Sequence, residues 1–406
     1  MRILNWVIVG VYSLLSAGVF AAALIMPAFR ANGWLAYAPL RELVLPPPAP
    51  IVLKLLYSTE KEAWLEEVIA RMQQDGLTVD GRPLQIELEK LGSREIVLAV
   101  INGEAQPDLI SPASSLQLAI LEDLSASKFG TAVISTADSA VCRPVVRTPL
   151  VIAAWKERAE VMWGDNPNGQ MWQRIHAALV SAQGWEALGH PEWGFVKYGQ
   201  TDPLKSNSGF MAILLMTYNY FGKTSGLTGQ DLLSDRDYQQ WFSEFQTSAV
   251  APFAQSTGPL MQDMITIGPS RYDFVAVYEA TAIEQAENAV GRYGELRIYY
   301  PPATVVSDHP FCALKATPAT PWVTAEKTRA GQAFLDYLTA QPVQELALLK
   351  HGFRPVNPAV SLTMPGSPLS QFATNGFRAD LPPEVEVPAG NVLNTLLDLW
   401  SRTINR

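Results

Sequence analysis

The stretch GQTDPLKSNSG, residues 199–209, decides the fold because it joins a strand-like run to a long apolar segment. We expect a strand at Trp193–Tyr198 and a helix at Asn207–Tyr220. Small polar side chains therefore stand where a helix begins, next to unpaired backbone N–H groups and the positive end of the helix dipole. Such a place can bind an anion or a polar ligand. The same residues are also ordinary N-cap residues, so both interpretations stay open here.

Strands and helices alternate in the first part of the exported chain. The expected strands are Ile51–Tyr57, Leu84–Leu88 and Asp108–Ile110. Thr59 and Glu62 have the spacing of a capping box, and Ser111-Pro112 is typical of a helix start. Short connections between such elements predict a mostly parallel sheet, in which ligands bind beyond the carboxyl ends of the strands.

A second set of elements follows a long strand at Val145–Trp155, in which Thr148-Pro149 predicts a hinge or an edge position. Later elements return to the first set, so the chain is expected to form a two-lobed clamp. Residues 51–150 and 301–358 are assigned to lobe 1, 151–300 to lobe 2, and 359–406 to a C-terminal extension. The further expected elements are helices near Gln170–Ala182, Asp235–Phe245, Pro259–Ile267, Arg329–Thr339 and Val343–Leu348, and strands at Phe274–Tyr278, Leu296–Tyr300 and Phe311–Leu314.

The N-terminus carries no charged residue from Trp6 to Phe29. Such a stretch is long enough to cross a bilayer as a helix, so we expect an uncleaved transmembrane anchor at residues 1–30. A cleaved signal peptide is the alternative, because Ala21–Ala23 and Ala36–Ala38 offer small residues for cleavage. A proline-rich linker is expected at residues 31–50. Either way the main domain is extracytoplasmic, on the cell membrane or exported.

Composition excludes several function classes. A net charge of −9 argues against nucleic acid as a partner, because phosphate binding needs clustered Lys and Arg. Outside the cytoplasm, Cys142 and Cys312 are expected to form a disulfide. Four scattered histidines show no metal-ligand spacing, and no Gly-x-Ser-x-Gly elbow is present. The sequence therefore predicts no catalytic residues, no metal and no cofactor, with a hydrolase kept as an alternative.

Four motifs in order resemble the bacterial extracellular solute-binding proteins, specifically the type II periplasmic binding protein fold that includes the molybdate-binding proteins. They are Thr201–Gly209, Asp108–Pro112, Val277–Glu279 and Gly331–Pro358. The resemblance covers about Ile51 to Pro358. The chain departs from the family in its apolar N-terminus without a lipidation cysteine and in the tail after residue 358.

The resemblance implies a small polar or charged ligand held between two lobes and delivered to the permease of an ABC-type importer. It implies no catalytic activity. Polar residues at strand ends and helix starts suggest nearly the same site as the resemblance does. A membrane-tethered sensor or assembly module using the same clamp is the alternative. Helix N-termini suit an anion, whereas Glu60, Asp202 and Glu279 suit a cation or an amine, so the ligand's charge stays open. The candidate ligand-binding residues are Ser58, Thr59, Ser111, Ser115, Thr148, Asp202, Ser206, Asn207, Tyr278 and Glu279.

Overall fold

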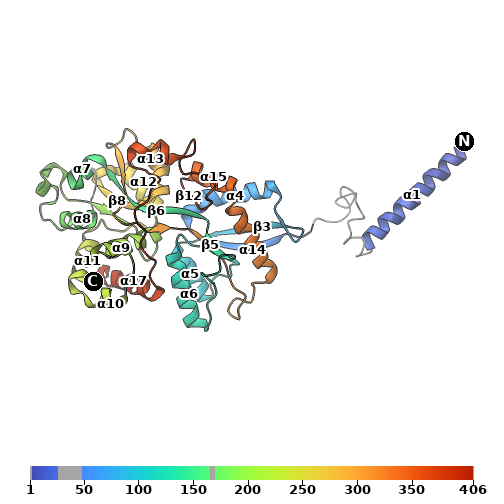
Figure 1. Ribbon diagram of the computed structural model, residues 1–406, viewed down its shortest axis with the longest axis horizontal. Helices are drawn as coiled ribbons and strands as arrows, with labels where there is room; N and C mark the ends of the chain where they lie inside the picture. The colour runs from blue at the N-terminus through green and yellow to red at the C-terminus, as the bar shows by residue number, and fades with distance from the viewer. Residues whose placement is uncertain (1, 26–47, 165–169, 406) are drawn as a thin grey trace. The chain divides into compact units, whose positions relative to one another are not determined.

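Strand β1 (Ile51–Tyr57) organises the first sheet in the computed structural model of the chain (Figure 1). Leu53 and Leu55 are fully buried on one face, and Leu56 is fully buried in a different core cluster. Because strand side chains alternate between faces, β1 joins two apolar layers, and each buried leucine contributes about 1.5–3 kcal/mol of transfer free energy.

The structure describes residues 2–25, 48–164 and 170–405. Contacts divide the chain into one unit of residues 1–50 with 81–83, and another of residues 51–80 with 84–406. The first unit contains helix α1 (Arg2–Ile25). Within the described ranges, no helix combines the length and the apolar character that a membrane crossing requires. The rest of the expected anchor and most of the expected linker, residues 26–47, lie outside the described residues.

The first sheet has a parallel centre and antiparallel strands on one side. Strand β1 pairs in parallel with β3 and β4, whereas β11 runs antiparallel to both β4 and β5. Helices α4 and α14 cover one face, and α5 and α6 the other. The strands in sheet order are β2 (Thr78–Val79), β3 (Arg82–Lys90), β1, β4 (Leu109–Ser111), β11 (Pro310–Ala313) and β5 (Cys142–Pro144), and the helices are α4 (Glu62–Asp75), α5 (Ser93–Asn102), α6 (Ser115–Phe129), α14 (Ala325–Leu338) and α15 (Gln341–His351).

The second sheet is built around one long strand, β6 (Val146–Trp155). Strands β8, β9, β10 and β12 all pair antiparallel with β6, whereas β7 pairs in parallel with β8. The expectation of a mostly parallel sheet in each lobe is therefore wrong for this sheet, which is mixed. The strands are β7 (Tyr198–Gly199), β8 (Phe274–Tyr278), β9 (Leu296–Tyr299), β10 (Val306–Ser307) and β12 (Arg354–Pro355).

Helices surround the second sheet, and the C-terminal segment adds two more. Helix α9 begins at Asn207 and ends at Tyr220, which confirms the predicted bounds. The others are α7 (Lys156–Trp163), α8 (Met171–Leu179), α10 (Gly229–Ser234), α11 (Arg236–Ser248), α12 (Thr257–Ile267), α13 (Glu279–Ala286), α16 (Pro368–Gln371) and α17 (Gly390–Ile404).

Three local predictions were wrong. Thr59 does not cap α4, because residues Thr59–Lys61 form a 3₁₀ turn and the helix begins at Glu62. The helix after β4 is capped by Ser114 rather than Ser111, since the Ser114 side chain accepts from the Leu116 N–H. The predicted strand at 193–198 shrinks to the two residues of β7, because Pro191–Trp193 forms a 3₁₀ turn.

A disulfide joins Cys142 on β5 to Cys312 on β11 within the first sheet. The two residues are 170 positions apart, and the intervening chain includes most of the second sheet. The covalent bond therefore closes the loop that leaves the first lobe and returns to it.

Candidate functional site

A layer of buried polar side chains lies where the first sheet meets the second lobe. Ser58 follows β1, Ser111 ends β4, and the Ser58 N–H donates to the Ser111 carbonyl at 3.0 Å. The Ser111 hydroxyl is completely buried and has no hydrogen-bond partner among the described residues. A buried hydroxyl without a partner is costly, so this position is suited to a ligand that supplies one.

Lys61 forms the centre of this layer, with 0% of its surface exposed. Its Nζ donates to the Ser58 hydroxyl at 2.6 Å and to the Pro112 carbonyl at 3.3 Å, and it lies 3.2 Å from His309 Nδ1. Burial lowers the pKa of Lys61 to about 7, although nearby Glu60 and Asp308 act in the opposite direction. Burial and the neighbouring Lys61 hold the pKa of His309 well below its usual value. Lys61 can therefore lose or gain a proton near neutral pH.

The second lobe contributes Asn207 and Tyr278 to the same layer. Asn207 is the first residue of α9, and its Nδ2 donates to the Tyr278 hydroxyl at 3.1 Å. Gln117 of α6 donates from Nε2 to Asn207 Oδ1 at 3.3 Å, which links the two lobes directly. The Gln117 Oε1 atom is buried without a partner among the described residues. Burial raises the pKa of Tyr278 well above its usual value, so its hydroxyl stays protonated.

A cavity of about 510 Å³ opens beside this layer. One wall comes from the start of α4, and the opposite wall from α12, β8 and α13. A volume of this size is typical of a small-molecule site. The lining residues are Thr59, Glu60, Glu62, Ala63, Glu66, Ser256, Gly258, Pro259, Tyr278, Ala280, Thr281, Glu284, Lys350, His351 and Phe353.

The charges in the cavity wall are mainly negative. Glu62 is paired with Lys90 at 2.8 Å, and both Lys350 and His351 contact Glu67. Glu60, Glu66 and Glu284 form no ion pair within the described part of the chain, and Glu60 Oε2 is buried without a hydrogen-bond partner there. Uncompensated carboxylates next to a cavity favour a cation or a hydrogen-bond donor.

Five of the predicted residues belong to this part of the molecule, four in the layer and one in the cavity wall. Ser58, Ser111, Asn207 and Tyr278 lie in the layer, and Thr59 lines the cavity.

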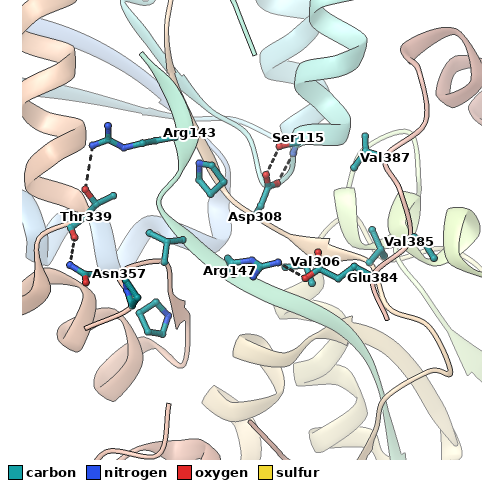
Figure 2. A pocket seen from close by; sticks show the side chains of 15 residues that line it. Ser115, Arg143, Arg147, Val306, Asp308, Thr339, Asn357, Glu384, Val385 and Val387 are labelled. Atoms are coloured by element: carbon teal, nitrogen blue, oxygen red, sulfur yellow. Dashed lines mark hydrogen bonds and ion pairs between the residues drawn. The ribbon is translucent and has the colours of Figure 1, made fainter. Parts of the chain in front are cut away.

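Ser115 lies instead at a second cavity of about 770 Å³, where its N–H and hydroxyl both donate to Asp308 (Figure 2). Figure 2 also shows Arg143 directed towards Thr339, and Arg147 towards Glu384 of the C-terminal segment. This cavity adjoins the strands that connect the lobes, and Ser115 is thus separated from the Ser58–Tyr278 layer.

The remaining predicted residues make structural contacts. Thr148 Oγ1 accepts from the Ala280 N–H at 3.0 Å, and Asp202 Oδ1 accepts from the Leu204 N–H at 2.8 Å in a turn. The Ser206 hydroxyl lies 3.3 Å from that of Ser208. Glu279 accepts from Arg354 Nε at 2.6 Å and from the Tyr300 hydroxyl, so its buried carboxylate is already bonded.

Sequence reasoning missed three residues of the layer: Lys61, Gln117 and His309. Lys61 carried a usable signal, because a residue three positions after Ser58 returns to the same side of a helical turn. His309 carried none, since it is 248 positions from Lys61 and meets it only through the fold.

The described residues contain no group of three or more His, Cys, Asp or Glu side chains that could hold a metal ion. The site therefore consists of hydroxyl, amide, phenol and ammonium groups beside a carboxylate-lined cavity. Such groups can bind and orient a polar solute between two lobes, and this defines a two-lobed binding protein.

Comparison with known proteins identifies the family. A family model of the bacterial extracellular solute-binding proteins matches residues 53–354, and the chain belongs to this family. A search of curated protein sequences found no match.

Solved structures share the fold at low sequence identity. The sulfate-binding protein SubI of Mycobacterium tuberculosis is 16% identical, with a TM-score of 0.52, 84% of this chain covered and 96% of that chain. Iron-bound HitA of Pseudomonas aeruginosa is 11% identical, with a TM-score of 0.57 and coverage of 87% and 99%. A periplasmic thiamin-binding protein is 12% identical, with a TM-score of 0.56 and coverage of 88% and 97%. These similarities establish the two-lobed fold, and the molybdate-binding subgroup stays a prediction.

Proposed function

We propose that this solute-binding protein delivers a small polar solute to an ABC importer and has no catalytic role of its own. The observation that carries the proposal is the direct bond between the lobes, from Gln117 to Asn207, beside a cavity of about 510 Å³. A structural neighbour from Agrobacterium tumefaciens, 15% identical with a TM-score of 0.54, is the substrate-binding protein of an ABC transporter. The alternative of a membrane-tethered sensor uses the same site and differs in its partner.

The proposed ligand-binding residues are those that the fold brings together. Five of them were expected from the sequence and three come from the structure. They are Ser58, Thr59, Ser111, Asn207 and Tyr278, joined by Lys61, Gln117 and His309. Ser115, Thr148, Asp202, Ser206 and Glu279 are left out of the proposed site because their side chains bond elsewhere.

The proposed solute carries hydrogen-bond donors and a positive charge. Glu60, Glu66 and Glu284 face the cavity without ion-pair partners in the described residues. Ser111 and Gln117 supply buried oxygen atoms that a donor would satisfy. Lys61 opposes a cation only in part, because its pKa of about 7 leaves it partly neutral at neutral pH.

A thermal-shift screen of the full chain against amines, polyamines, divalent cations, amino acids, sugars and oxyanions tests this proposal. A ligand of the native state raises the melting temperature, and a hundredfold excess over its Kd stabilises the protein by about 2.7 kcal/mol. We expect a shift with an amine or a cation, and no shift with sulfate or molybdate. A shift with oxyanions alone would contradict the proposed charge.

A second candidate function, acyl transfer, is favoured by one contact. Ser58 and Lys61 are spaced as Ser-x-x-Lys at the start of a helical segment, and Lys61 Nζ is 2.6 Å from the Ser58 hydroxyl. A neutral lysine could accept the hydroxyl proton during attack on a carbonyl. A fluorophosphonate probe followed by mass spectrometry separates the two functions, because covalent labelling of Ser58 would favour a hydrolase and no labelling would favour binding alone.

We also propose that residues 6–29 hold the protein at the membrane, since this stretch contains no charged residue. Fractionation of cells that express the full chain tests this. Release of the protein by high salt or in a shorter, cleaved form would contradict the anchor.

A further inference from the structure

The C-terminal segment after residue 358 lies outside the part of the chain that matches the family, which ends at residue 354. Residues 383–385 of this segment lie beside the strands that connect the lobes. The Thr304 N–H donates to the Pro383 carbonyl, and the Val385 N–H donates to the Thr304 carbonyl. Glu384 pairs with Arg147 of β6, as Figure 2 shows. These contacts fix the path of the segment across the connecting strands.

Residue Glu386 then attaches the segment to the second lobe. Its N–H donates to the Thr224 carbonyl, and its carbonyl accepts from the Tyr218 hydroxyl of α9 at 3.0 Å. Its carboxylate accepts from the Gly226 N–H at 2.7 Å. Helix α17 follows immediately and lies beside α10 and α11 (Figure 1).

Helix α17 is anchored on the second lobe by its apolar face. Leu393, Leu396 and Trp400 are buried at helical spacing, in a core cluster that contains residues of α9 and α11 and also residues of α5 and α6. The Trp400 indole N–H donates to Gln246 Oε1 of α11 at 3.0 Å, and its ring packs against Phe253. The Trp400 contacts, together with those of Glu386, attach the helix to the second lobe.

The same helix packs against α6 of the first lobe, and one of its charges acts on α5. Gly390 lies so close to α6 that a Cβ atom there would stand 2.7 Å from the Ala119 carbonyl and 2.9 Å from Asp123 Cβ. Further along, burial lowers the pKa of half-buried Arg94 of α5, and the charge of Asp398 acts in the opposite direction. Helices α6 and α17 pack along each other, although they come from opposite lobes.

We propose that α17 is a latch that holds the two lobes together in the arrangement described here. The latch is fixed to the second lobe and grips α5 and α6 of the first lobe. A lobe rotation that opens the site must separate Gly390 from α6 and Asp398 from Arg94. The strength of this grip sets how often the site opens, and so it regulates solute entry and release. This inference rests on the two-lobed binding function but not on the identity of the solute.

The test uses the full chain without any solute. Cysteines introduced at Leu98 of α5 and at Val180 after α8, both exposed and on opposite lobes, carry spin labels for pulsed distance measurements. Hydrogen exchange of the α17 amides is measured on the same proteins. Two variants weaken the contact between α17 and the first lobe. Gly390→Val places a side chain against the Ala119 carbonyl, and Arg94→Gln, the milder change, removes the positive charge on which Asp398 acts.

The matched control is Gly229→Ala on α10. This glycine also faces α17, but its Cβ would lie 3.9 Å from Thr395 Oγ1, which is ordinary contact, and it is on the lobe to which the latch is fixed. We expect longer and broader distance distributions in Gly390→Val and Arg94→Gln, with α17 amides exchanging about tenfold faster in Gly390→Val, and wild-type behaviour in the control.

Two results would overturn the latch. Faster exchange of α17 with unchanged distances in a folded Gly390→Val protein would show that the helix does not hold the lobes. Unchanged exchange and distances in both variants would show that these contacts do not hold the helix. Should Gly390→Val fail to fold, Arg94→Gln decides alone through its distance distribution. Neither result bears on solute binding, so failure of the latch is distinguishable from failure of the proposed function.

Discussion

Glu279 and Arg354 form the most completely buried ion pair described in this protein, with side chains 0% and 5% exposed. Arg354 donates to both carboxylate oxygens, at 2.6 and 2.8 Å, and also to the Arg378 and Ala379 carbonyls. The pair joins β12 to the first residue of α13. It therefore fixes the place where the chain crosses between the lobes.

Replacing Glu279 by Ala is expected to reduce the free energy of unfolding by about 3–5 kcal/mol, because the Arg354 charge would remain buried without its partner. Urea denaturation of the full chain measures this loss. Glu284→Ala on the same helix is the control, since Glu284 has no ion pair among the described residues. An equal loss in both variants would contradict the account of Glu279.

The buried Lys61 makes stability depend on pH. Its pKa is about 7 in the folded protein, below the unfolded value of about 10.4, so the unfolded chain binds more protons between these two values. Stability contributed by this group is therefore lowest below pH 7 and rises between about pH 7 and about pH 10. In Lys61→Met, the slope of unfolding free energy against pH should be shallower in this window. The same slope in both proteins would contradict a neutral Lys61.

At the scale of single residues, the sequence predicted candidate residues at the ends of strands, and the structure brings three of them into one layer. Ser58, Ser111 and Tyr278 were selected because strand ends are visible in the apolar pattern. Glu279 looked equivalent, but its partner Arg354 is 75 positions away and could not be read from local sequence. Contacts between residues that are far apart in the sequence depend on the fold, and local sequence does not reveal them.

Helix α9 shows what local sequence determines at the scale of elements. The helix is buried from Asn207 to Tyr218, so a continuous apolar run in the sequence marks where it begins and ends. The neighbouring strand was overestimated because Trp193 is a strand-forming residue that here ends a 3₁₀ turn after Pro191. The parallel sheet was predicted from short connections, but β6 pairs antiparallel with β8 and β9 across long stretches of chain.

Gly209 controls how α9 meets the loop before it. A Cβ atom at this position would lie 2.1 Å from the Thr201 carbonyl oxygen, which is backbone and cannot yield easily. Gly209→Ala should therefore destabilise the protein by at least about 1–3 kcal/mol. Gly258→Ala on α12 is the control, because nothing lies within 4 Å of its Cβ. Chemical denaturation of both variants gives the comparison, and equal stabilities would show that the loop is free to move.

At the scale of the whole molecule, the Cys142–Cys312 disulfide closes a loop of 170 positions. Cross-linking so long a loop restricts the unfolded chain, and its loss should cost about 2–5 kcal/mol. Denaturation of Cys142→Ser/Cys312→Ser against the oxidised wild type measures the cost. An unchanged midpoint would show that the second lobe holds the first sheet together without the covalent bond.

The hydrogen bond between Gln117 and Asn207 joins the two lobes at the place where we propose that a solute is held. The most direct measurement is titration calorimetry of the solute with the largest thermal shift against wild type and Asn207→Ala, with exposed Asn288→Ala as the control. One site per chain in the wild type and the control, with at least about tenfold weaker binding in Asn207→Ala, is the predicted result. Equal affinity in all three proteins would place the solute elsewhere and contradict the interlobe site.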